Sequence, residues 1–175
     1  LSPCMVISNT DIRSLKIIGK VMELLGFVFV DRSRRRSIQE LLEPTKQMIT
    51  KSQVNMSFFP EGTTNDGIEI HPFKTSFFKI AVDSKSGVQP LAFRWTHANG
   101  GKLSKDQFQF FTFLITDGSI ITHLMSILGL RGKRLRVKVL HTITPEEISK
   151  NKWTRKEVSQ TSEASIRAAM LDDDW

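Results

Sequence analysis

The stretch Gly26-Phe27-Val28-Phe29-Val30-Asp31-Arg32 decides the fold. Four consecutive apolar residues without polar alternation are typical of a strand that is buried on both faces, as in a parallel or mixed sheet. The charged pair that follows at once marks the end of that strand. In open α/β sheets, ligands bind beyond the carboxyl ends of the strands, so Arg32 is placed where a binding residue is expected.

The segments on either side of this stretch predict alternating strands and helices. An apolar strand is expected over Cys4–Ile7, and a helix over Ile12–Leu25 that Gly26 ends. A second helix is expected over Ile38–Ile49, kinked or divided at Pro44. A strand over Val54–Phe59 follows it.

The second half of the chain continues this alternation, and two Thr-x-x-Glu capping boxes precede its last helices. We therefore predict one α/β domain over residues 1–175, with a mixed, largely parallel central sheet wrapped by helices. The further expected elements are a helix containing Phe73, Phe77, Ile80 and Ala81, strands over Val88–Phe93, Phe108–Ile115 and Arg134–Val139, a helix over Ile120–Leu130, the capping boxes Thr144–Glu147 and Thr154–Glu157, and a terminal helix to about Met170.

Composition excludes several classes of protein. Apolar residues make up 39% and charged residues 25% of the 175 residues, as in ordinary globular proteins. The single Cys4 excludes a disulfide framework and a cysteine-rich zinc site. No stretch approaches the ~20 apolar residues that a spanning helix needs. The net charge of +7 predicts an anionic partner, which could be nucleic acid, anionic lipid or a phosphorylated substrate.

Three short motifs end predicted strands and carry the candidate chemistry. The second one contains a Pro-Glu-Gly turn that lets the backbone approach a ligand closely. The motifs are Gly26–Arg32, Phe58–Gly67 with Phe73–Phe77 behind it, and Val88–Phe93.

In this order and spacing, the motifs resemble the PlsC-type glycerolipid acyltransferases, typified by lysophosphatidic acid acyltransferases, over about residues 6–166. The resemblance implies transfer of a fatty acyl chain from an acyl-CoA or acyl carrier protein thioester to a lysophospholipid or glycerol phosphate, in phospholipid biosynthesis. It also implies association with an anionic membrane surface on the cytoplasmic face, with no cofactor besides the acyl donor.

The resemblance assigns the acceptor site to residues of the first two motifs. The guanidinium of Arg32 matches a phosphate bidentately. Thr64 stands where many relatives have arginine, so Lys74 is the best remaining cation for that contact. The strand Val88–Phe93 would line the substrate cleft or only pack in the core. The candidate substrate-binding residues are Arg32, Glu61, Gly62, Thr63, Thr64 and Lys74.

The family's catalytic pair, a histidine followed after four residues by an aspartate, is absent from this sequence. In the family, this histidine acts as general base and the aspartate orients it. None of His71, His97, His123 and His141 has the aspartate at that spacing. We expect the pair upstream of Leu1, an incomplete N-terminal layer of the fold, and no activity in the chain alone.

The sequence does not match a phosphate-binding P-loop or a nucleic-acid-binding surface. Gly62-x4-Gly67 lacks the Lys-Ser/Thr of a P-loop, and the aromatic residues do not alternate with basic ones as in a nucleic-acid surface. We predict no metal site and no nucleic-acid partner. A non-catalytic lipid- or phosphate-binding relative of the same fold stays open. Basic residues predicted to meet a membrane or to form a solvated strand face are Arg131, Lys133, Arg134, Arg136 and Lys138.

Overall fold

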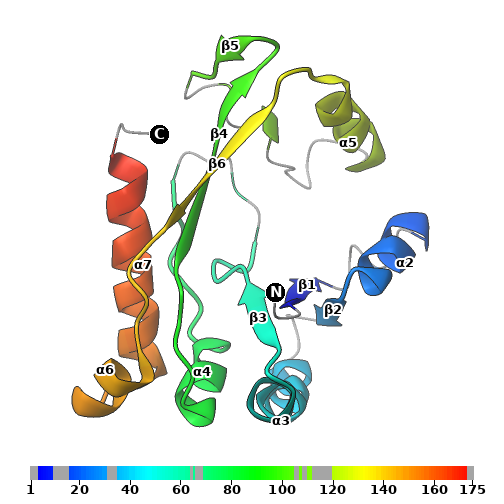
Figure 1. The fold of residues 1–175 in the computed structure, drawn as a ribbon. Helices are drawn as coiled ribbons and strands as arrows, with labels where there is room; N and C mark the ends of the chain where they lie inside the picture. The colour runs from blue at the N-terminus through cyan, green and yellow to red at the C-terminus, as the bar shows by residue number, and fades with distance from the viewer. Residues whose placement is uncertain are drawn as a thin grey trace. The chain divides into compact units, whose positions relative to one another are not determined.

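A computed structural model describes residues 4–9, 16–30, 35–63, 65, 69–104, 107, 110–111 and 120–172 of the chain (Figure 1). The chain divides into two compact units. The first comprises Leu1–Gly62, Lys74–Val88 and Ile143–Ser159. The second comprises Thr63–Phe73, Gln89–Thr142 and Gln160–Trp175.

A parallel sheet forms the centre of the first unit, with the strand order β2-β1-β3. Val6 of β1 pairs with Phe27 of β2 on one side and with Ser57 of β3 on the other. The strands predicted from the apolar runs therefore belong to one parallel sheet. The elements of this unit are β1 (Cys4–Asn9), α2 (Lys16–Leu24), β2 (Phe27–Val30), α3 (Arg35–Ser52), β3 (Asn55–Phe58), α4 (Phe78–Ser84) and α6 (Pro145–Lys150).

The core of the first unit lies between this sheet and its helices. Ile7, Val30, Phe77 and Ile80 form one buried cluster, each exposed by 5% or less. Half-buried apolar residues of α3 and β3 pack against it. Phe58 meets Phe78 edge to face, with ring centroids 5.1 Å apart. Burial of such side chains contributes about 1.5 to 3 kcal/mol each to the stability of the unit.

Local signals explain where the helices begin and end. Gly26 follows α2 with a φ of +85°, in the left-handed region that glycine adopts without strain. Thr144 caps α6 in a complete capping box with Glu147. Of the two alternatives expected at Pro44, a kink or a division, the division is wrong, because α3 runs through Pro44 from Arg35 to Ser52. Pro44 is exposed, so its ring meets solvent and not the core.

An antiparallel sheet in the order β5-β4-β6 organises the second unit. Its strands are β4 (Leu91–Ala98), β5 (Gly101–Lys102) and β6 (Arg134–Val139), and α5 (Ile120–Gly129) lies between β5 and β6 in sequence. The last helix, α7 (Arg155–Leu171), begins in the first unit and continues into the second.

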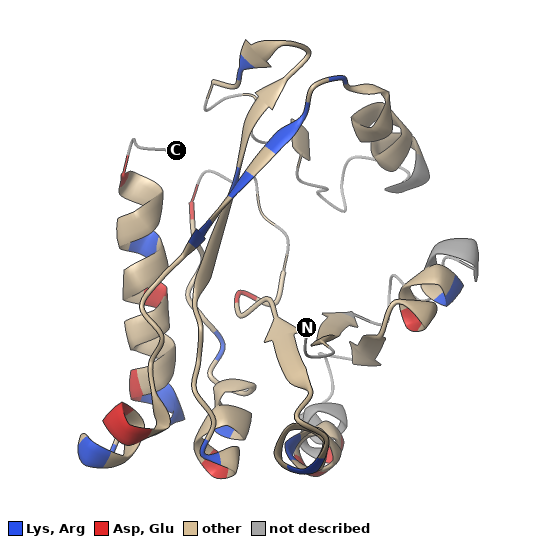
Figure 2. Ribbon diagram, in the orientation of Figure 1, with Lys and Arg blue, Asp and Glu red and all other residues tan. Residues whose placement is uncertain are grey.

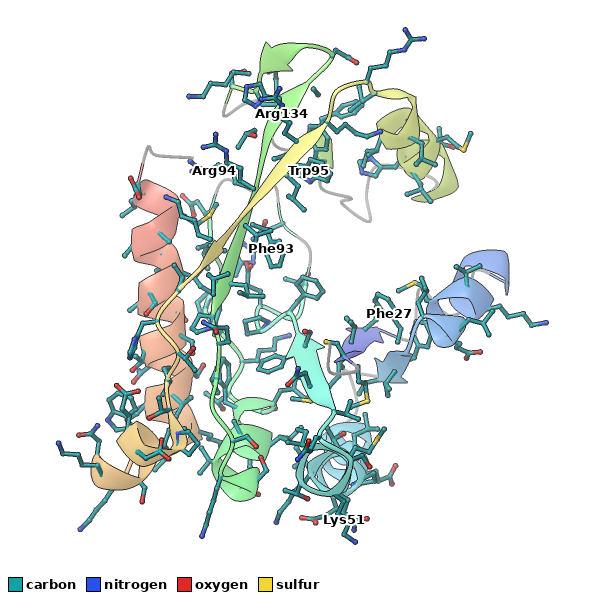
Figure 3. The ribbon with its side chains drawn as sticks, viewed as in Figure 1. Phe27, Lys51, Phe93, Arg94, Trp95 and Arg134 are labelled. Carbon is teal, nitrogen blue, oxygen red and sulfur yellow. The ribbon has the colours of Figure 1, made fainter. Side chains whose placement is uncertain are left out.

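The two faces of the β4–β6 pair differ in what they contact. On one face Ala92 and Thr96 are buried, and the guanidinium of Arg94 donates to the Met170 carbonyl of α7 at 2.7 Å. Arg94 and Trp95 lie on opposite sides of β4 (Figure 3). The opposite face, which we call the apolar ribbon face, consists of Leu91, Phe93 and Trp95 of β4 with their register partners Val139, Val137 and Leu135 of β6.

The structure confirms the mixed α/β class and divides its two kinds of strand pairing between two sheets. The strand expected over Val88–Phe93 starts later, at Leu91, because Pro90 has no N–H for the ladder. Val88 instead pairs with Ile143. Of the strand expected over Phe108–Ile115, the two described residues, Phe110 and Phe111, lie in a 3₁₀ turn.

Candidate functional site

The carboxyl edge of the parallel sheet positions the candidate site. Asn9, at the end of β1, pairs with Val30, at the end of β2. Phe58, at the end of β3, pairs with Ile7 of the same central strand. Since the three strands are parallel, their carboxyl ends lie at one edge of the sheet, where α/β proteins bind ligands. The Pro60-Glu61-Gly62 motif leaves from this edge.

A tight turn follows β3. The Gly62 N–H donates to the Phe59 carbonyl at 3.2 Å, which closes a four-residue turn with Pro60 and Glu61 in its middle. The φ of Gly62 is +71°, a conformation that costs an L-residue about 1 to 2 kcal/mol. Glycine is therefore required by the backbone of this turn.

Lys74 lies directly across Gly62. A Cβ atom added at Gly62 would lie 2.9 Å from both Cδ and Nζ of Lys74, closer than such atoms approach. The backbone holds the two segments together, because the Lys74 N–H donates to the Pro60 carbonyl at 2.8 Å. The missing side chain of Gly62 thus makes the space through which the lysine ammonium reaches the turn.

The structure brings three of the six predicted binding residues together in one unit. Glu61 and Gly62 are half-buried in the turn, and Lys74 is exposed above it. Thr63 follows Gly62 and is exposed. Arg32 and Thr64 lie outside the described residues. A cation, a carboxylate and open backbone at a sheet edge could bind an anionic group and orient a neighbouring hydroxyl.

Glu163 and Arg167 of α7 hold the segment that precedes Lys74, a role that the sequence analysis missed. In the second unit, the Phe73 N–H donates to Glu163 at 2.8 Å, and Arg167 donates to the Ile70 carbonyl at 2.6 Å. The two side chains also pair with each other at 2.9 Å. Their four-residue spacing on a helix was the available signal for that pair. Both backbone contacts depend on tertiary structure.

The described part of the chain contains neither a candidate metal site nor a candidate membrane-spanning helix. Among those residues, no group of three or more His, Cys, Asp and Glu side chains could hold a metal ion. None of the described helices has the length and apolarity to cross a bilayer.

A family model named Acyltransferase matches residues 1–94, which include the parallel sheet, the Gly62 turn and Lys74. The chain therefore belongs to the acyltransferase family. More narrowly, it belongs to the PlsC-type branch, homologous to 1-acyl-sn-glycerol-3-phosphate acyltransferases and lyso-ornithine lipid O-acyltransferases.

Curated relatives match almost all of this chain. A 1-acyl-sn-glycerol-3-phosphate acyltransferase of Neisseria meningitidis is 28% identical over 98% of this chain and 62% of its own length. A lyso-ornithine lipid O-acyltransferase of Rhodobacter capsulatus is 27% identical over 94% and 57%. The chain thus spans about three fifths of the curated relatives it matches.

A solved structure supports the fold. The crystal structure of the 1-acyl-sn-glycerophosphate acyltransferase PlsC from Thermotoga maritima aligns with a TM-score of 0.52 at 22% identity. The alignment covers 98% of this chain and 58% of the other. At this identity the likeness shows the fold.

Proposed function

We propose that this chain is the acceptor-binding and core part of an acyltransferase domain that esterifies an anionic lysolipid at a membrane surface. The acceptor would be a lysophospholipid or glycerol phosphate, and the donor an acyl-CoA or acyl carrier protein thioester. The acceptor oxygen would form the new ester bond to the acyl carbon, while the carbon–sulfur bond breaks and the thiol leaves. A general base would take the hydroxyl proton.

The packing of Lys74 across Gly62 carries this proposal. The exposed Lys74 side chain occupies the place that a side chain at position 62 would take, so an anionic ligand bound at the turn would meet its ammonium. The ammonium would bind the acceptor's phosphate, with Arg32 and Thr64 as further contacts, while Glu61 and Thr63 would shape the site around the reacting hydroxyl. Positioning of this kind lowers the barrier by holding the hydroxyl close to the thioester.

Acyl-transfer kinetics on the full-length protein test the role of Lys74. Loss of a charge-assisted hydrogen bond costs about 1.5 to 3 kcal/mol, so Lys74→Ala should raise the acceptor KM by roughly tenfold to a hundredfold. Lys74→Arg should retain part of the binding. Lys79→Ala removes a matched lysine that pairs with Asp83 on the neighbouring helix α4, and it should leave KM unchanged. An unaltered KM in Lys74→Ala would contradict the proposal.

The same assay separates the acceptors. Lysophosphatidate and a lyso-ornithine lipid both offer an acidic group to Lys74, a phosphate in one and a carboxylate in the other. Comparing kcat/KM for the two acceptors identifies the substrate, and salt should weaken binding of the phosphate more strongly because it carries more charge. Binding of lysophosphatidate without turnover would instead favour a non-catalytic lipid-binding relative.

A further inference from the structure

Helix α5 combines an apolar surface with a complete lack of charge. No Lys, Arg, Asp or Glu occurs from Ile120 to Leu130. Leu124, Met125 and Leu128 are 41%, 63% and 61% exposed. Their spacing of one, three and four residues places them on one side of the helix. The opposite side is occupied, since Ile127 is half-buried and His123 lies beside Phe110 with ring centroids 6.4 Å apart.

Positive charge is concentrated in the part of the chain that includes α5. Residues 89–142 contain eight Lys and Arg against two Asp, so this segment supplies most of the chain's net charge of +7. Figure 2 shows α5 without charge and Lys and Arg along the loop and strand that follow it. Three exposed cations there, Lys102, Arg131 and Arg134, form what we call the basic turns.

Hydrogen bonds and strand pairing hold the basic turns next to one another. The Arg131 N–H donates to the Asn99 side chain at 3.0 Å, and the Asn99 N–H donates to the Arg131 carbonyl at 2.7 Å. Lys102 and Arg134 are both register partners of His97, from opposite sides of β4. The cations of the α5–β6 loop and of β5 therefore belong to one rigid end of the sheet.

Lys133 donates hydrogen bonds to backbone carbonyls at the end of α5. Its ammonium donates to the carbonyls of Ile127, Leu128 and Leu130 at 3.0, 3.2 and 2.9 Å. The Ile127 carbonyl also accepts from the Leu130 N–H at 3.2 Å, and in an apolar medium a carbonyl at a helix end is costly to leave unmet. The lysine thus supplies hydrogen bonds to the end of α5.

We infer that α5 docks on an anionic phospholipid bilayer, with Leu124, Met125 and Leu128 entering the interface and the basic turns binding the headgroups. Interfacial helices bind by this combination of apolar area and positive charge. A bilayer fits better than a folded protein partner, because the exposed surface of α5 carries no charge and the Ser126 hydroxyl already donates to the Thr122 carbonyl of the same helix. The inference deepens the membrane association proposed above and names its surface, but it does not depend on the acyl-transfer step.

Vesicle co-sedimentation of the full chain tests this inference. Leu124→Gln/Leu128→Gln keeps helix propensity and removes the apolar side, and it should lower partition into mixed phosphatidylcholine–phosphatidylglycerol vesicles by about tenfold or more. Thr122→Gln, on another side of the same helix, should bind as the wild type does. Equal binding by all three proteins, or no binding by the wild type, overturns the inference.

Charge removal gives an independent measurement. Arg131→Gln and Arg134→Gln should each weaken binding to the anionic vesicles about fivefold, which corresponds to about 1 kcal/mol per cation. Neither should alter binding to pure phosphatidylcholine. The control Lys51→Gln/Lys156→Gln removes two exposed charges elsewhere and should have no effect. If this control lost as much vesicle binding as Arg131→Gln or Arg134→Gln, binding would depend on net charge alone, and the inference would be overturned.

A tryptophan reporter keeps the test valid if the glutamine variant folds poorly. Met125→Trp should show a blue-shifted emission component with anionic vesicles, absent from Thr122→Trp, because indole favours the bilayer interface. Sedimentation velocity tests whether another protein covers this side of α5. Self-association that Leu124→Gln/Leu128→Gln abolishes would overturn the inference. Binding of acyl carrier protein through the same residues, without vesicle binding, would also overturn it. Turnover of an acceptor in detergent micelles should be unchanged in Leu124→Gln/Leu128→Gln. This measurement separates a failure of the bilayer inference from a failure of the proposed acyl transfer.

Discussion

The two sheets use similar apolar residues and place them in opposite surroundings. In the parallel sheet, Ile7 and Val30 are 1% and 2% exposed. On the apolar ribbon face of the antiparallel sheet, Phe93 and Val139 are 47% and 68% exposed. Helices α3 and α4 cover the core of the first sheet, whereas in the second sheet the face opposite the apolar ribbon face bonds Met170 of α7 through Arg94 and Asp172 through Lys138.

This difference separates stability from recognition. Buried residues such as Ile7 and Val30 contribute to the free energy of folding. Neighbouring exposed apolar side chains such as Phe93 and Val139 mark surfaces that meet lipid, a ligand or another part of a protein. The candidate acceptor site lies at the carboxyl edge of the buried sheet, where its positions are held firmly. The proposed bilayer contact lies in the unit with the exposed sheet.

The largest expected effect compares one phenylalanine from each unit. Phe78→Ala should lower the free energy of unfolding by about 3 to 5 kcal/mol, because the ring is 2% exposed and packs against Phe58. Phe93→Ala should cost about 1 kcal/mol or less, in proportion to its partial burial. Denaturant unfolding of both variants measures this. Equal losses would mean that the apolar ribbon face is as well covered as the core of the first unit.

The sequence predicted the parallel sheet better than the antiparallel one. Continuous apolar runs such as Phe27–Val30 predicted the strands of a parallel sheet, but the expected burial on both faces is wrong for β2, an edge strand in which only Val30 is buried. The β4–β6 pair alternates apolar and polar residues, which predicts two unlike faces without saying what covers either. Pro90 moved the start of β4, a boundary effect that hydrophobicity does not reveal.

The candidate site was predictable in its residue types and only partly in its geometry. Glu61, Gly62 and Lys74 were chosen from their motifs, and the structure brings them together. The contact between Lys74 and Gly62 requires the chain to return after 11 residues, which no local pattern specifies. Lys133 and Lys138 were predicted to meet a membrane or to form a solvated strand face; the structure adds that Lys133 donates to the end of α5 and that Lys138 pairs with Asp172 at 2.7 Å.

A smaller effect is expected at the turn of the first unit. Gly62→Ala should cost about 1 to 2 kcal/mol of stability through its φ of +71°. It should also displace Lys74 and raise the acceptor KM as Lys74→Ala does. The double variant should be no worse in KM than either single variant, since all three remove one contact. Gly129→Ala, where an added Cβ meets nothing within 4 Å, is the control. Additive effects on KM would show that Gly62 acts independently of Lys74.

In the second unit, a comparable local change concerns the end of α5. Lys133→Met keeps the side-chain length and removes the ammonium from three carbonyls, so it should cost about 1 kcal/mol and increase amide exchange in the last turn of α5. Arg136→Met, on the exposed β6 strand, serves as the control for loss of a charge. Unchanged exchange in Lys133→Met would show that water replaces the lysine at no cost.

The smallest expected effect returns to the first unit, at the start of α7. The Thr154 hydroxyl donates to the Glu157 carboxylate, which also accepts from the Thr154 N–H at 2.8 Å. These hydrogen bonds hold the pKa of Glu157 below its ordinary value of 4.5.

A lowered pKa in the folded state means that the carboxylate stabilises the fold above pH 4.5, and that this contribution is lost as the pH falls through the folded-state pKa. Thermal unfolding followed across that range should show a slightly shallower acid-induced loss of Tm in Glu157→Gln than in the wild type. Glu146→Gln, an exposed carboxylate in the first turn of α6, provides the matched control, and an equal change in both variants would assign the effect to helix charge alone.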